Sequence, residues 1–364
     1  MKRRNLPAAS PETQQSRQQG DGDRPIDVLS DTLRVVRLSG AVFLNAIFTS
    51  PWSIETVTPA ELAANLRLPS DCIALFHIVV QGQCWLAIPG YVPVLLAAGD
   101  AILIPHSAPH VITSDLRVTP IPITSILQPP PPDGLASVIG GGLGETTQFV
   151  CGFLHCDQRF NPLIGALPEL IVIHPGEGER NDGQRVGQRE PTTVLSVQPG
   201  DWLETTMRHT VTESLGGGPG NSDMLARLCE ILFFEVVRRY MQQLPAAHPG
   251  WLAGVRDPIV GQVLRLLHAH PGYPWTVEEL ARTVAVSRSS LADRFTTLVG
   301  ETPMRYLAAW RMSIAARRLR DGDAIVRQIA HEVGYDSEFA FARAFKRATG
   351  SAPGQYRKLT QTTS

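Results

Sequence analysis

The chain has 364 residues, of which 43% are hydrophobic and 18% are charged, as in a globular protein of two or three domains with a sizeable core. No run of about 18 apolar residues occurs, so the sequence predicts neither a transmembrane helix nor a membrane partner. The basic start, Met1-Lys2-Arg3-Arg4, precedes no apolar segment, and we expect no secretory signal. The five cysteines are irregularly spaced, which favours a reduced, cytoplasmic protein over a disulfide-stabilised one.

The net charge of −1 hides a difference between the two parts of the chain. Residues 251–364 contain 16 Lys and Arg against 10 Asp and Glu, whereas residues 1–250 contain 17 against 24. A basic C-terminal part favours a polyanionic partner, such as nucleic acid, for that part of the chain.

The N-terminal part combines a polar tail with a β-rich region. Residues 1–25 are rich in Gln, Arg, Asp and Gly and are predicted to be a disordered tail. From residue 35 to residue 126, short runs rich in Val and Ile alternate with turn signals such as Pro89-Gly90 and Gly99-Asp100. This pattern predicts the many short strands of a barrel or jelly roll within a domain over residues 26–199. Residues 175–192 are polar and Gly-rich, which is typical of a mobile loop.

Helices are predicted next, over residues 200–212 and about 223–244. In the second segment, Leu225, Leu228, Ile231, Leu232 and Val236 recur at helical spacing. So much apolar surface must be buried against something, and the sequence allows two alternatives. The helix packs on its own domain, or it forms a dimer contact. We expect residues 200–244 to be a helical dimerisation region and residues 245–256 to be a linker.

Two segments near the C-terminus, residues 276–300 and 324–350, resemble each other at a separation of about 49 residues. In each segment, a small residue is followed four positions later by another small residue. These are Ala281 and Ala285 in the first segment and Ala330 and Gly334 in the second. Two helices that cross steeply through a short turn need a small residue at their contact and a tolerant residue at the turn. The repeat therefore predicts two helix-turn-helix units within residues 257–360.

The helix boundaries support this assignment. Thr276 with Glu279 fits a capping box, and Ser287 and Ser337 fit N-caps of recognition helices over residues 288–299 and 338–349. Between the units a helix is predicted over residues 304–320, about 25 Å long at 1.5 Å per residue. A rigid spacer of this size is suited to set two recognition helices into adjacent major grooves, which lie about 34 Å apart.

The outward faces of the two recognition helices follow from their apolar positions. With Leu291, Phe295, Phe341 and Phe345 directed inward, the remaining residues are exposed, and Arg343 is suited to bidentate bonding with guanine. The alternative is a solvated charged face on a helical bundle. Candidate phosphate contacts are Arg288, Arg294, Lys346 and Arg347.

A set of motifs in one order over about 100 residues identifies a family for this region. Residues 257–358 resemble the AraC/XylS-type DNA-binding domain, which implies seven helices with base-reading positions at Ser289, Ala292 and Asp293 and at Glu338, Phe339 and Arg343. Ala292 and Asp293 are poor hydrogen-bond donors, so the first unit is expected to act more through phosphate contacts and DNA shape. The resemblance rests on Trp275-Thr276-Val277-Glu278-Glu279-Leu280-Ala281, Ser287-Arg288-Ser289-Ser290-Leu291, Gly300-Glu301-Thr302-Pro303, Ile329-Ala330-His331-Glu332-Val333-Gly334-Tyr335 and Arg343-Ala344-Phe345-Lys346.

The strand region, over roughly residues 27–175, resembles the cupin-type sensing domain of one AraC-like subgroup. The motifs are Phe76-His77-Ile78-Val79-Val80-Gln81-Gly82, Cys84-Trp85-Leu86, Gly99-Asp100, Ile104-Pro105 and Pro109-His110. The resemblance implies a small-molecule site in the barrel, for which His77, Trp85, His106 and His110 are the candidates.

No metal is expected in this barrel. Metal-binding cupins offer a close pair of histidines, a carboxylate and a further histidine, and the close pair is missing here. Cys151, His155 and Cys156 have suitable donor atoms, but on a strand Cys156 points away from the other two. His77 is instead expected to be a barrel residue whose hydrogen bonds are satisfied.

Two functions from different classes follow. The first is a sequence-specific transcription regulator of α+β multidomain architecture that binds double-stranded DNA as a homodimer, responds to a small-molecule effector and has RNA polymerase as a candidate partner. The second is a cupin-fold enzyme with a helical appendage. No nucleophile elbow, phosphate loop or dinucleotide motif is visible, so we predict no catalytic residue and no cofactor.

Overall fold

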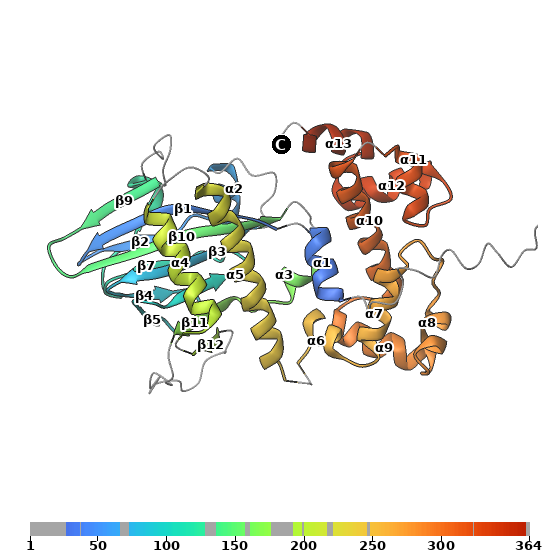
Figure 1. Ribbon diagram of the computed structural model, residues 1–364, viewed down its shortest axis with the longest axis horizontal. Coiled ribbons are helices and arrows are strands. Elements are labelled where there is room, and N and C mark those ends of the chain that lie inside the picture. The colour runs from blue at the N-terminus through green and yellow to red at the C-terminus, as the bar shows by residue number, and fades with distance from the viewer. Residues whose placement is uncertain are drawn as a thin grey trace, which may run out of the picture.

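The computed structural model describes residues 27–36, 38–65, 73–127, 136–156, 161–175, 192–198, 200–216, 221–245, 248–322 and 324–361. The predicted disordered tail over residues 1–25 and nearly all of the predicted loop over residues 175–192 lie outside these residues. Figure 1 shows a β-rich N-terminal domain and a helical C-terminal domain side by side.

Two sheets form the N-terminal domain and face each other around an apolar core. In the described part of the chain the larger sheet has seven strands and the smaller has five. The larger sheet has the spatial order β12 (Thr192–Val197), β11 (Leu170–Pro175), β6 (Ala101–Ile104), β3 (Ile73–Gln81), β10 (Thr146–Cys156), β1 (Leu38–Thr49) and β9 (Ala136–Gly141). The smaller sheet has the order β5 (Val94–Ala97), β4 (Gln83–Ala87), β7 (Val111–Thr113), β2 (Ser53–Glu55) and β8 (Ile121–Pro122).

The strands of the larger sheet are apolar on both faces. In β3, Leu75 and Val79 point into the barrel, whereas Phe76 and Ile78 point to the opposite face. Because side chains alternate along a strand, each face needs its own cover. The smaller sheet covers the inner face, and two helices cover the outer one.

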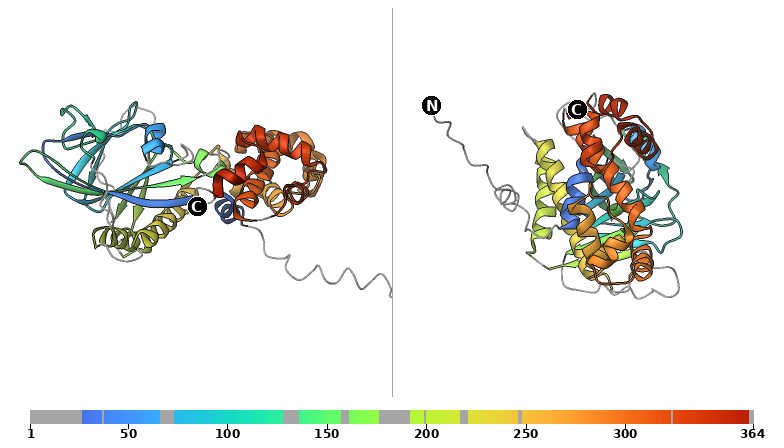
Figure 2. Two further views of the ribbon diagram at one scale, coloured as in Figure 1. Left: turned by 90° about the horizontal axis from the view of Figure 1, so that it is seen from above. Right: turned by 90° about the vertical axis from the view of Figure 1, so that its right-hand side faces the viewer.

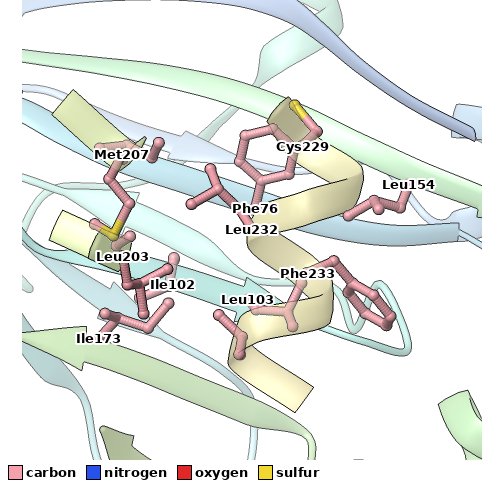
Figure 3. Close-up of a pocket in the computed structure, with 13 residues that line it drawn as sticks. Phe76, Ile102, Leu103, Leu154, Ile173, Leu203, Met207, Cys229, Leu232 and Phe233 are labelled. Carbon is pink, nitrogen blue, oxygen red and sulfur yellow. The ribbon is translucent and has the colours of Figure 1, made fainter. Parts of the chain in front are cut away.

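Helices α4 (Trp202–Gly216) and α5 (Asn221–Gln243) form the outer cover, and Figure 2 shows them along one side of the strands. Leu225, Leu232 and Val236 of α5 are buried against the sheet, so packing on its own domain accounts for one face of this helix. Ile231 stays 43% exposed on the other face. Helix α5 therefore has one apolar face that is buried against the sheet (Figure 3) and another that is exposed.

Two glycines of the larger sheet allow close contacts, one with α5 and one with a neighbouring side chain. A methyl group at Gly40 of β1 would lie 2.8 Å from Cβ of Cys229 in α5. At Gly152 of β10 it would lie 1.9 Å from the ring of Phe76. Neither position has room for a side chain, because such distances are far inside van der Waals contact.

The C-terminal domain is helical and begins earlier than expected. Residues 251–256, predicted as the end of a linker, form helix α6 (Trp251–Arg256), and Trp251 and Leu252 are buried in the domain core. Six residues are too few to show a helical period, which is why the sequence pattern missed this helix. The further helices are α7 (Val260–Ala269), α8 (Val277–Thr283), α9 (Arg288–Val299), α10 (Pro303–Asp321), α11 (Val326–Glu332), α12 (Glu338–Thr349) and α13 (Pro353–Gln361).

Helix α1 (Val28–Val36), which the sequence analysis did not predict, joins the two domains. It precedes β1 in the chain but packs on α7 and α10 of the C-terminal domain (Figure 1). Asp31 Oδ2 lies 3.0 Å from Nδ1 of His268, whose Nε2 lies 2.8 Å from the hydroxyl of Tyr306. The His268 ring stacks on Trp310 at 3.9 Å, and burial lowers the pKa of His268 despite the nearby carboxylate. A neutral, hydrogen-bonded histidine thus anchors α1.

The remaining short elements are α2 (Pro59–Asn65), α3 (Pro162–Gly165) and the 3-10 turn η2 (Ile123–Ser125). Among the described residues, no helix combines the length and apolar character that a membrane span requires.

The close approach at Gly152 is testable. Gly152→Ala is expected to lower the free energy of unfolding by about 1–3 kcal/mol, because the added methyl displaces the Phe76 ring. Urea denaturation of the full-length protein measures this loss. Gly165→Ala in α3 is the matched control, since nothing lies within 4 Å of its added methyl. Equal stability of the two variants would contradict the packing argument.

Candidate nucleic-acid interface and sensor site

The first helix-turn-helix unit consists of α8 and α9. The predicted capping box is present: Glu279 N donates to Thr276 Oγ1 at 3.1 Å, and Thr276 N donates to Glu279 Oε2 at 3.1 Å. Ala285 at the turn has a φ of 55°, a left-handed conformation that costs an L-residue about 1–2 kcal/mol. Ser287 then caps α9 by accepting a bond from Ser290 N at 3.2 Å.

The second unit, α11 and α12, repeats this design. Gly334 occupies the turn with a φ of 79°, and Ser337 caps α12 by accepting a bond from Ala340 N at 3.4 Å. Ala281 and Ala330 are both buried where the helices of each unit meet. The predicted repeat is therefore a structural repeat.

The two units lie at opposite ends of α10 (Figure 1). Its 19 residues correspond to about 28 Å of helix. Arg311 of α10 donates from Nε to Pro271 O at 2.6 Å and from Nη2 to Tyr273 O at 2.8 Å, which ties the first unit's entry loop to the helix. A methyl group at Gly334 would lie 2.6 Å from Gly272 O, so this loop also touches the second unit's turn. These contacts connect both units to each other and connect the first unit to α10.

The recognition helix α9 exposes Ser289 and Asp293, while Ala292 is half-buried. Arg288 is exposed and pairs with Glu278 at 2.9 Å. Arg294, predicted as a phosphate contact, instead donates from Nε and Nη2 to Asp257 at 3.1 and 2.6 Å. Asp257 also accepts bonds from the first backbone amides of α7, so this ion pair fixes α9 against α7. The Arg294 side chain remains 45% exposed in this pair, and its contact with a DNA phosphate stays a prediction.

The recognition helix α12 presents a more basic surface. Glu338, Phe339 and Arg343 are exposed, with Phe339 73% accessible to solvent. The Arg343 guanidinium lies 5.9 Å from the centre of the Phe339 ring, a cation–π contact that steadies a long side chain. Lys346 and Arg347 are exposed in the last turn.

The barrel interior contains a chain of hydrogen bonds. His110 Nδ1 lies 2.8 Å from Ala108 O, His77 Nε2 lies 3.1 Å from His110 Nε2, and His77 Nδ1 lies 2.7 Å from Cys151 Sγ. One set of neutral tautomers satisfies all three: the Cys151 thiol donates to His77, His77 donates to His110, and His110 donates to the carbonyl. Burial lowers the pKa of His110 to about 4 and that of His77 well below its usual value.

The four predicted effector-binding residues do not converge on one site. His77 and His110 bond to each other, whereas His106 lies apart with Nε2 3.1 Å from Leu167 O. Trp85 is half-exposed on the face of β4 opposite to Cys84 and Leu86, which point into the barrel core. Strand alternation therefore excludes Trp85 from the barrel interior.

The donor set does not fit a metal either. His77 and His110 face each other with one nitrogen each, whereas Cys151 lies at the other ring nitrogen of His77, so the three donors do not converge on one point. No group of three or more His, Cys, Asp or Glu placed to hold a metal occurs in the described parts of the chain. The side chain of Cys156 lies outside the described residues.

Comparisons with known proteins agree with both halves of this architecture. A family model described as Cupin matches residues 27–187, and one described as Helix-turn-helix domain matches residues 280–359. AraC-like transcription regulators from Streptomyces lividans and Streptomyces antibioticus are each 31% identical over 92% of this chain and over 98% and 99% of their own lengths. The HTH-type transcriptional regulator AlkR of Acinetobacter baylyi is 28% identical over 92% of this chain and 99% of its own length.

The chain belongs to the AraC family of transcription regulators. Both resemblances drawn from the sequence, an N-terminal cupin domain and a C-terminal helix-turn-helix domain, are confirmed. What sequence reasoning missed in this AraC-family protein are the residues that position the site. Arg311 lies within the stretch that resembles the family and Gly272 does not, but no local pattern indicates the role of either residue, because both roles arise from contacts with distant segments.

The buried histidines predict an acid-sensitive barrel. Unfolded histidine binds a proton near pH 6.5, whereas folded His110 does so only near pH 4, so stability is lost as pH falls through this interval. For His110 alone the loss amounts to about 3 kcal/mol. Urea denaturation from pH 7 to pH 4 should show this loss in the wild type and a smaller one in His110→Asn.

His209→Asn is the matched control for this measurement. His209 is 56% exposed on α4, so its replacement should leave the pH dependence of the wild type intact. A His110→Asn protein with the full wild-type acid sensitivity would refute the assignment.

Proposed function

We propose that this AraC-family regulator binds specific operator DNA as a homodimer, with α12 as the main base-reading helix. The observation that carries the proposal is the pair of exposed recognition helices held on one rigid body by α10, Arg311 and the Gly272–Gly334 contact. Rigid spacing lets both helices enter successive grooves without a loss of orientational entropy on binding.

The two helices have different tasks in this proposal. On α12, Arg343 bonds guanine in the major groove, and Glu338 and Phe339 contact neighbouring bases. On α9, Ser289 and Asp293 offer few donors, so this helix contributes through DNA shape and through the phosphate contact of Arg288. Lys346 and Arg347 bind phosphates beside α12.

The location and partners of the protein follow from its proposed binding to DNA. Because chromosomal DNA is the substrate of recognition, we place the protein in the cytoplasm, at the nucleoid when it is bound. RNA polymerase is the partner through which a bound regulator changes transcription. A small molecule held by the N-terminal domain supplies the signal, and α5 supports this role because it leads directly from the sheet into the DNA-binding domain.

Arg343→Ala tests the base-reading role. Operator fragments are first selected from genomic DNA with the full-length protein, and affinity is then measured by fluorescence anisotropy. Arg343→Ala is expected to weaken operator binding by about 1–3 kcal/mol and to leave binding to unrelated DNA nearly unchanged. Arg347→Ala is the matched control, which should weaken both equally and reduce the salt slope by about one. Failure of the wild type to prefer any genomic fragment would contradict the proposed function.

The homodimer is supported by the uncovered face of α5. Its outward residues are spaced alternately by three and four positions, the spacing of a two-helix seam. Met224, Ile231 and Phe234 are 37%, 43% and 41% exposed, which is unusual for large apolar side chains on one helix face. The same face in a second copy of the chain is complementary to it, as a two-fold interface requires. The stripe consists of Met224, Arg227, Ile231, Phe234 and Arg238.

Ile231→Glu is expected to convert the dimer to a monomer. Two glutamates would face each other across the two-fold axis in an apolar seam, where unpaired charge is costly. Sedimentation equilibrium measures the mass. Ile139→Glu is the matched control, since Ile139 is 78% exposed on β9, the edge strand of the larger sheet. A variant that remains dimeric would show that another surface mediates assembly.

A further inference from the structure

The recognition helix α12 carries a large apolar side chain that is mostly exposed. Phe339 is 73% exposed, the highest fraction among the large apolar side chains in the described part of the DNA-binding domain. It is the second residue of α12 and lies on the side of the helix away from Phe341 and Phe345, which are buried in the domain core. A residue near the N-terminus of a recognition helix is placed to reach base edges.

The first unit shows that the fold does not require this phenylalanine. Ser287 and Ser337 cap the two recognition helices in the same way, so Ser289 on α9 occupies the place that Phe339 occupies on α12. Both side chains are exposed. Because the same chain has a serine in the equivalent place, packing within the unit does not explain the large apolar side chain on α12. Its exposure on the recognition helix indicates a role in contact with DNA.

Phe339 also contacts the residue that we assign to guanine. The Arg343 guanidinium lies 5.9 Å from the centre of the Phe339 ring, and the two residues are four positions apart on one side of α12. Successive base pairs are about 3.4 Å apart along the duplex. With Arg343 bonded to a guanine, the Phe339 ring therefore faces the base pair next to that guanine.

We propose that Phe339 reads the C5 methyl group of a thymine in the base pair adjacent to this guanine. The assignment rests on the proposed function, in which α12 enters the major groove and Arg343 bonds guanine. Thymine presents the only methyl group on the major-groove edges of the four bases. The other edges present donors and acceptors, which a phenyl ring would remove from water without a replacement bond. The ring therefore favours thymine and disfavours the other bases at this position.

Deoxyuridine isolates the methyl group, because it pairs as thymidine does but lacks this group. An operator is selected from genomic DNA with the full-length protein, each thymidine is replaced in turn, and affinity is measured by fluorescence anisotropy. For the wild type, replacement at one position of an α12 site should weaken binding about fourfold, because one methyl group is no longer buried. Phe339→Ser introduces the residue of the first unit and should bind the thymidine and deoxyuridine operators equally.

Two further variants show whether the effect belongs to this ring. Phe339→Leu retains an apolar side chain and should keep part of the preference for thymidine. Leu359→Ser removes an apolar side chain that is 56% exposed on α13, outside both recognition helices, and should keep the whole preference. Because the Phe339 ring is exposed, Phe339→Ser should unfold at nearly the same urea concentration as the wild type, so that lost discrimination is not a lost fold.

A second base analogue locates the guanine in the same operator. In 7-deazaguanine the N7 acceptor for Arg343 is missing, so its introduction should weaken binding of the wild type but not of Arg343→Ala. The thymidine that Phe339 reads should lie in the base pair directly next to this guanine. A separation of two or more base pairs would overturn the proposal, as would a deoxyuridine effect that persists in Phe339→Ser or is absent from the wild type.

The outcomes separate this proposal from the proposed function. Binding to the operator with natural bases is measured first, and its absence would refute the DNA-binding proposal whatever the base analogues do. Intact operator binding with an Arg343-dependent guanine and no Phe339-dependent thymidine overturns only the thymine assignment.

Discussion

The close packing of α5 on the larger sheet is the constraint on which the rest of the molecule depends. Because Gly40 and Gly152 lack side chains, the helix and the Phe76 ring lie closer to the strands than any other residues would permit. One face of α5 therefore joins the core of the N-terminal domain, and its opposite face stays open. The C-terminal end of the helix then meets Arg256, which caps it from the next domain. A single helix thus touches the sheet, the open surface and the DNA-binding domain.

In the DNA-binding domain, a few backbone contacts orient the two helix-turn-helix units. Arg311 and the contact between Gly272 and Gly334 connect the two units, so the relative orientation of α9 and α12 depends on backbone contacts outside both helices. The two turns reach the same geometry at different cost. Gly334 adopts its left-handed conformation freely, whereas Ala285 does so with strain. The first unit therefore depends more on the packing around its turn than the second.

Much of this architecture could be predicted from the sequence, where local signals were strong. The 49-residue repeat, the capping box at Thr276 and the apolar spacing of both recognition helices lie within short segments, and each is present in the structure. Contacts between segments that are distant in the chain produce no local pattern in the sequence. Helix α1, helix α6 and the Arg294–Asp257 ion pair depend on partners that no local pattern names. Trp85 is different, since strand alternation with Cys84 and Leu86 was sufficient to place it outside the barrel.

The packing of α1 changes how the two domains are best regarded. One continuous apolar cluster extends from Val28 of α1 through the sheet and α5 to Trp310 of α10, so the described parts of the two domains share a core. The chain leaves α1 directly into β1, and α5 packs on β1. The DNA-binding domain therefore contacts the N-terminal part of the chain at two points: His268 bonds to α1, and Arg256 bonds to the end of α5. Both α1 and α5 adjoin strand β1. Because β1 follows α1 directly and packs against α5, this strand lies next to both contacts with the DNA-binding domain.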